Sequence, residues 1–167
     1  MAVTTQYSTQ YGGVGDTPSV ASLPNSYDVG RKQAYWFDHT QSGAGDATST
    51  VDLVFLPAGK YRILIAESHI EWTAFGASRL LDIGLRAYTN ADGTAVVVDD
   101  NLYDDDVDVS SAGQAAMGSD YITATLANKA KGHYIDALNG VSLFCTVAGG
   151  TIPDAAQLHG YITIMRA

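Results

Sequence analysis

The densest group of chemically active side chains lies between positions 99 and 108, in the stretch DDNLYDDDVD. Its six aspartates account for six of the nine net negative charges of the 167-residue chain. Asp104, Asp106 and Asp108 recur at every second position, as do the first calcium ligands of an EF-hand loop. Val109 stands where such a loop needs glycine, and no Glu closes it. No EF-hand is therefore predicted, although another type of calcium site in a β-loop stays open.

Two further interpretations of this stretch need no metal. Its like charges would repel other sheet edges and keep the edge soluble. Alternatively, the carboxylates face Lys or Arg side chains on a neighbouring protein. In both cases we expect an exposed loop between strands, anchored to the core by Leu102, Val107 and Val109. Replacing its aspartates by asparagine should then leave folding largely intact.

The remaining candidate groups form no recognised catalytic motif. The histidines are scattered at His39, His69, His133 and His159. His69 and Glu71 give H-x-E, but the cysteine motif of a zinc deaminase does not follow. Glu67 and Glu71 would lie about 13 Å apart along a strand, too far for a glycosidase pair. Nucleophile-elbow and phosphate-loop motifs are also missing. We therefore expect a non-enzymatic protein without catalytic residues or a cofactor.

Composition narrows the classes further. The net charge of −9 argues against direct nucleic-acid binding, which needs a basic face. No apolar run approaches 18 residues, and the first residues do not resemble a signal peptide, so no membrane segment is expected. The single cysteine, Cys145, lies in VSLFCTV and is expected to be a buried small hydrophobic residue.

Short alternating segments indicate the fold class. In KYRILIAES, Tyr61, Ile63 and Ile65 share one face, and RLLDIGLRAY places Leu81 and Ile83 on one face in the same way. Turn residues such as those of TNADG separate about nine such runs, among them QAYWF, TVDLVFL, HIEWTAF, TAVVV, YITATLA, VSLFCTV and GYITIMRA. Only AGQAAMGS and ANKAKGHYIDAL could hold a turn or two of helix. The pattern predicts an all-β protein, an antiparallel β-sandwich or jelly-roll with about nine strands.

The first 30 residues differ from the rest and are rich in Thr, Ser, Gln, Gly and Pro. We expect an extended N-terminal arm over 1–30 and a β-sandwich domain over 31–167. A disordered tail or one edge strand is the alternative. Aromatic side chains of the arm and the following segment are the candidate contacts with another subunit or protein: Tyr7, Tyr11, Tyr27, Tyr35 and Trp36.

The order of motifs over about residues 50–167 resembles a known family. It runs through LPAGKYRILIAES, RLLDIGL, ADGTAVVVDDNLYDDDVDVSSAG, YITATLA and GYITIMRA. This order is similar to the decoration, cement or head auxiliary proteins of tailed bacteriophages. Residues 1–49 are not matched.

The resemblance implies a sandwich that assembles, commonly as a homotrimer, on the outer surface of an icosahedral capsid. Its partner there would be the major capsid protein, whose neighbouring subunits it would clamp together. It implies a virion protein that is made in the host cytoplasm and has no catalytic residues.

Other functions remain open at this point. A tail or baseplate component would suit the same fold. A calcium-dependent carbohydrate-binding module would stack sugars on Trp36, Trp72 and Tyr103 and hold the ion with Asp104, Asp106 and Asp108. Against this, Trp36 and Trp72 lie in apolar segments and are expected in the core. A cupin-like enzyme needs converging histidines, which the spacing does not favour.

Overall fold

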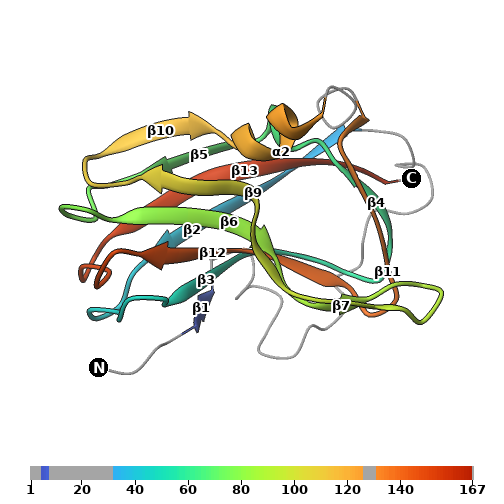
Figure 1. The fold of residues 1–167 in the computed structure, drawn as a ribbon, viewed down its shortest axis with the longest axis horizontal. Coiled ribbons are helices and arrows are strands. Elements are labelled where there is room, and N and C mark those ends of the chain that lie inside the picture. Colours follow the sequence, from blue (N-terminus) through green and yellow to red (C-terminus); the bar gives the residue numbers. More distant parts are fainter. Residues whose placement is uncertain (1–4, 8–31, 126–130, 167) are drawn as a thin grey trace.

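Two β-sheets pack face to face in a computed structural model that describes residues 5–7, 32–125 and 131–166 (Figure 1). The predicted all-β sandwich is confirmed. The described residues form thirteen strands rather than about nine, because β9 (Asp99–Asp108), β11 (His133–Ala137) and several short strands were not expected. No helix in these ranges is long and apolar enough to cross a membrane.

The first sheet has the strand order β1-β3-β12-β6-β9. The short strand β1 pairs in parallel with β3, and the other neighbours are antiparallel. The bounds are β1 Thr5–Tyr7, β3 Thr50–Leu56, β12 Val141–Ala148, β6 Leu80–Leu85 and β9 Asp99–Asp108.

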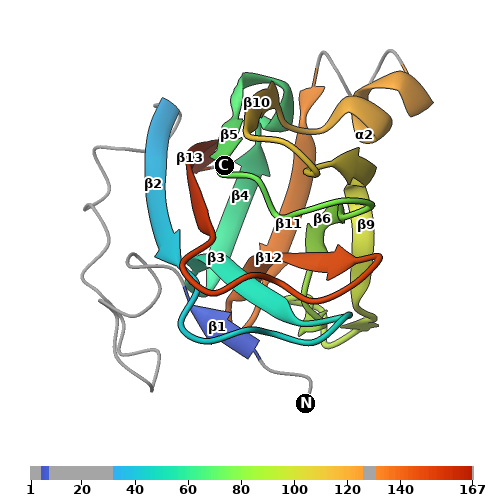
Figure 2. The same ribbon diagram turned by 90° about the vertical axis from the view of Figure 1, so that its left-hand side faces the viewer.

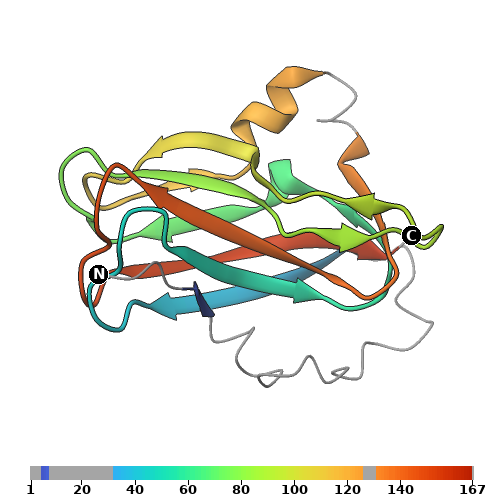
Figure 3. The ribbon, with the colours of Figure 1, turned by 60° about the horizontal axis from the view of Figure 1, so that its bottom comes forward.

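The second sheet is built around β13 (Gln157–Arg166). Strand β2 (Lys32–Thr40) pairs along almost all of β13 (Figure 3). β5 (His69–Trp72) and then β4 (Gly59–Ile63) pair with successive parts of β13. A 3-10 turn, η2 (Ile65–Glu67), connects these two strands. β10 (Gly113–Ala116) continues the sheet beside β5, and β11 (His133–Ala137) continues it beside β4.

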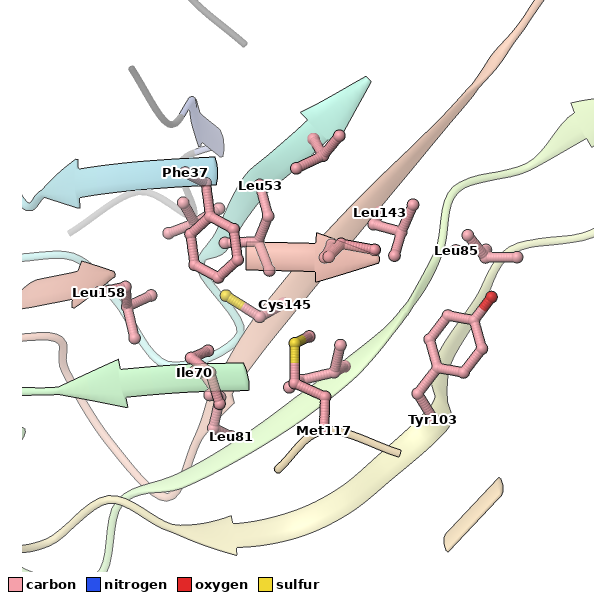
Figure 4. Close-up of a cluster of buried hydrophobic side chains, with 14 of the residues drawn as sticks. Phe37, Leu53, Ile70, Leu81, Leu85, Tyr103, Met117, Leu143, Cys145 and Leu158 are labelled. Atoms are coloured by element: carbon pink, nitrogen blue, oxygen red, sulfur yellow. The ribbon is translucent and has the colours of Figure 1, made fainter. Parts of the chain in front are cut away.

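The hydrophobic core lies between the sheets and follows the predicted alternation. Tyr61, Ile63 and Ile65 are all buried, as are Leu81 and Ile83. Figure 4 shows side chains from both sheets meeting, including Phe37, Leu53, Ile70, Leu81, Leu143, Cys145 and Leu158. Burial raises the pKa of the Cys145 thiol to about 12. The prediction that Cys145 acts as a buried hydrophobic residue is confirmed.

Two segments differ from the sequence-based expectation. The acidic stretch is the edge strand β9 and not a loop. YITATLA, predicted to be a strand, begins in the helix α2 (Ser119–Ala124). The two segments that could hold a turn or two of helix also contain the strands β10 and β11, and Ser119 at the end of the first segment begins α2. The predicted TNADG turn is confirmed, because it joins β7 (Tyr88–Thr89) to β8 (Ala95–Val96) in a hairpin.

Candidate interaction surfaces

The acidic strand β9 contains a β-bulge that separates its carboxylates. Leu81 pairs with Val107 and Ile83 with Asp104, so that Asp105 and Asp106 both lie opposite Asp82. Asp106 adopts a positive φ of 60°, which lets the extra residue fit into the strand. The regular alternation assumed for Asp104, Asp106 and Asp108 is therefore interrupted, and the predicted calcium set does not form one face.

Asp104 is buried in the fold, and only 1% of its surface is exposed to solvent. Its carboxylate accepts hydrogen bonds from the backbone N–H of Gly118 at 2.5 Å and of Ser119 at 2.7 Å. The Ser119 hydroxyl donates a third bond at 2.7 Å. These bonds satisfy N–H groups at the start of α2, which lies beside β9 (Figure 2). Asp104 of strand β9 thus supplies the N-terminal cap of α2, because the residue at the N-cap position itself is Gly118, which has no side chain.

A different trio of carboxylates does gather at the bulge. Asp82, Asp105 and Asp106 each offer an oxygen within 4.8 Å of the others. The Asp106 N–H donates to Asp82 at 2.9 Å. Partial burial, opposed by this bond, raises the pKa of Asp82, and the neighbouring aspartates raise it further. Oxygen donors of this kind suit a hard cation, although Asp105 and Asp106 are exposed to solvent.

The outer face of the second sheet carries a different combination of side chains. Alternate residues of β2, β13 and β5 point away from the core and form what we call the aromatic–acidic face. Its members are Trp36, Asp38, His69, Glu71, His159 and Tyr161.

Strand register arranges this face in two rows. Tyr161 of β13 lies opposite Trp36 on one side and His69 on the other. The Trp36 and Tyr161 ring centroids are 5.0 Å apart, and those of His69 and Tyr161 are 6.2 Å apart. This row presents aromatic surface from three strands.

The second row is polar. His159 lies opposite both Asp38 and Glu71, and its Nδ1 is 3.0 Å from an Asp38 carboxylate oxygen. The two rows line a hollow of about 420 Å³. Trp36 is 64% exposed, so one large aromatic ring stands open to solvent beside the carboxylates. The face can therefore combine ring stacking with charged hydrogen bonds.

Gly160 lies beneath the face, between the two rows. A Cβ there would lie 2.2 Å from the His69 carbonyl oxygen and 2.6 Å from the Phe37 ring. The absence of a side chain lets Phe37 pack under the face and lets β5 approach β13 closely. The face is thus supported directly by the core.

The residues predicted to make contacts have different environments in the structure. Trp36 is exposed, so the expectation that it belongs to the core is wrong, while Trp72 is 7% exposed and confirms that expectation. Tyr35 precedes Trp36 and therefore points inward, against the core. Tyr7 is the last residue of β1, and Tyr11 and Tyr27 lie outside the described residues. The sugar-stacking set fails as a unit, because Trp72 and Tyr103 are buried.

Solved structures provide a comparison for this arrangement. No family model and no curated protein matches the sequence. The chain superposes on a chain of the capsid of Ralstonia phage GP4 with a TM-score of 0.65, 16% identity and 98% coverage of both chains.

The fold is shared with chains of phage capsids. A second example is in the cyanophage Pam1 capsid asymmetric unit, with a TM-score of 0.53 and 14% identity. That alignment covers 87% of this chain and 92% of the other. At these identities the likeness establishes the architecture of the described sandwich.

A second exposed surface is apolar and lies near the β7–β8 hairpin. Val97 is 78% exposed and Val98 52%, and both follow β8 directly. Leu138, just after β11, and Tyr134 within it are about half exposed. A hollow of about 210 Å³ lies nearby, lined by Tyr88, Val97 and Leu102 among others. Clusters of this kind suit contact with another protein.

Most of the aromatic–acidic face was missed by sequence reasoning. Asp38 and Tyr161 were not singled out, and His69, Glu71 and His159 were considered only as catalytic or metal-binding groups. The useful signal is alternation, since residues 34, 36, 38 and 40 are all exposed in β2. Alternation does not reveal that β2 pairs with β13, and that pairing brings the six side chains together.

Proposed function

We propose that the chain is a virion structural protein that binds the outside of an icosahedral phage capsid and stabilises contacts between major capsid subunits. The superposition on the GP4 capsid chain over 98% of both chains carries this proposal. The motif order of residues 50–167 gives independent support for a decoration or cement role. The protein needs no active site for this role, because its work is to bury surface against its neighbours.

The chain offers surfaces suited to such assembly. The aromatic–acidic face and the apolar residues Val97, Val98 and Leu138 lie on different parts of the sandwich. We propose a homotrimer, with residues 1–30 acting as an arm that reaches a neighbouring subunit. Linked subunits would bind a shell with high effective concentration even when each single contact is weak.

The direct test is to locate the protein in purified virions of the phage that encodes it. Mass spectrometry should find it in full heads, and a reconstruction by electron microscopy should place it outside the shell. Its presence in isolated tails instead of heads would favour the tail or baseplate alternative. Absence from both would overturn the proposal.

Binding to capsids that lack the protein tests the arm and the trimer separately. Native mass spectrometry of the purified chain should show three copies. Deletion of residues 1–30 should weaken co-sedimentation with these capsids. If the shortened chain binds as tightly as the full chain, the arm does not contribute and the rest of the proposal stands.

A further inference from the structure

The aromatic–acidic face combines an exposed aromatic ring with two carboxylates, which suits a planar cation. We infer that this face binds an arginine side chain presented by another protein, with the guanidinium stacked on Trp36 and paired with the carboxylate of Asp38, while Glu71 across β13 adds negative charge. For the identity of that other protein, a capsid chain, the inference rests on the proposed function.

The aromatic row supplies the stacking surface. A guanidinium group is planar and weakly hydrated, and it packs on the face of Trp or Tyr rings. Trp36 is 64% exposed and lies 5.0 Å from Tyr161 between ring centroids. One ring is thus open to a ligand while the other holds it in place from the neighbouring strand.

The polar row supplies negative charge to pair with a guanidinium, and each carboxylate stands two residues along its strand from a member of the aromatic row. Asp38 is two residues after Trp36 on β2, and Glu71 is two residues after His69 on β5. Both therefore face outward beside the aromatic row. Carboxylates accept the paired N–H groups of arginine in a bidentate arrangement, whereas the ammonium group of lysine offers only a point charge.

The arginine is expected to come from a different protein. Among the described residues, each of the four arginines is already engaged within its own chain. Arg86 pairs with Asp52 at 2.8 Å, and Arg62 donates to the Lys131 carbonyl at 2.7 Å. Arg79 donates to three backbone carbonyls, and Arg166 lies over the Tyr61 ring. The protein's net charge of −9 also favours a basic partner over a second copy.

A titration of the full isotope-labelled chain tests the site without any capsid. The chain has only two indole N–H signals, and that of Trp72 is a reference because it donates to the Ser111 carbonyl at 2.9 Å. N-acetyl-arginine amide should shift the Trp36 signal and leave the Trp72 signal in place. The neutral isostere N-acetyl-citrulline amide should cause a much smaller shift at the same concentration. Equal shifts from both would overturn the inference.

Substitutions assign the contacts. Asp38→Asn and Glu71→Gln should each weaken arginine binding about two- to fivefold, and the matched control Asp100→Asn on the other sheet should not. Trp36→Ala, followed through the Tyr161 amide signal, should weaken it similarly, while Trp36→Phe retains most of the affinity. Binding of methyl glucoside in place of arginine would identify a sugar surface and overturn the inference.

The double variant Trp36→Ala/Glu71→Gln separates this inference from the proposed function. It should bind capsids lacking the protein about tenfold more weakly than the unaltered chain. Unchanged binding would show that the face makes no contact with the capsid, although the chain would still be a capsid protein. Arginine binding by a chain that is absent from virions would leave the site intact and refute the proposed function. Formation of larger oligomers through this face would point to a second copy and contradict the inference.

Discussion

The hydroxyl oxygen of Tyr103 lies 2.9 Å from Nδ1 of His133, and this contact joins β9 of the first sheet to β11 of the second. Tyr121 of α2 packs its ring against both, with ring centroids 5.5 Å from Tyr103 and 5.3 Å from His133. Burial lowers the pKa of His133, opposed by the nearby Asp99, and raises that of Tyr103 well above its usual value. Both groups are therefore held neutral at one end of the sandwich.

Stability should fall in mildly acidic solution because of His133. Its folded-state pKa lies below 6.5, so the unfolded chain takes up the proton more readily. The contribution is fully present above about pH 6.5 and declines as the pH falls toward the folded-state pKa. Urea unfolding at about pH 7.5 and pH 5.5 should show a smaller pH dependence in His133→Gln than in the unaltered chain. The same slope in both would contradict this assignment.

Asp104→Ala should be strongly destabilising. The substitution leaves the N–H groups of Gly118 and Ser119 without their buried acceptor, which we expect to cost about 2–4 kcal/mol of unfolding free energy. The exposed Asp100→Asn is the control and should change stability by less than about 0.5 kcal/mol. The sequence-based expectation was that replacing Asp104 by asparagine would leave folding largely intact. In the structure this replacement would set an amide NH₂ against one of these N–H donors, so it should also be destabilising. Denaturant unfolding measures the free energy of each variant, and an unchanged value for Asp104→Ala would contradict the prediction.

Asp82→Asn should stabilise the protein at neutral pH. The raised pKa shows that the charged form of Asp82 is disfavoured in the fold, by partial burial first and then by Asp105 and Asp106. An asparagine oxygen can still accept the bond from the Asp106 N–H. Because solvent screens this half-exposed site, we expect a gain below about 1 kcal/mol, which should disappear below about pH 4. A lower melting temperature at neutral pH would show that the carboxylate stabilises the bulge.

Substitution of the two tryptophans should lower the stability of the fold by very different amounts. Trp72→Ala removes a buried ring together with its bond to Ser111 and should cost about 3–5 kcal/mol. Trp36→Ala removes an exposed ring and should cost less than about 0.5 kcal/mol. Melting curves measure both, and the fluorescence of Trp36→Phe should report the buried Trp72 alone. A large loss of stability in Trp36→Ala would mean that this ring is needed for the fold.

Local patterns in the sequence were sufficient for the inward faces of the strands. Alternation identified Tyr61, Ile63 and Leu81 as core residues, because one face of each strand must be buried. The Asp92-Gly93 turn was visible for the same reason, since its chemistry is local. The all-β class followed from these features.

Features that depend on distant residues could not be predicted. Nothing in the sequence near α2 indicates that Asp104 caps this helix. YITATLA is rich in strand-forming residues, so its composition alone predicts a strand. The bulge at Asp105 and Asp106 is fixed by pairing with β6, so the alternating aspartates were misleading. The aromatic–acidic face likewise exists only through the register of β2, β13 and β5.

The position of β13 has a consequence for how the protein is made. Residues 157–166 hold together β2, β4 and β5, which are synthesised much earlier. These earlier strands have no completed sheet to join until β13 has emerged from the ribosome. Until then the nascent chain carries open strand edges, and chaperone capture of these edges would protect it from aggregation.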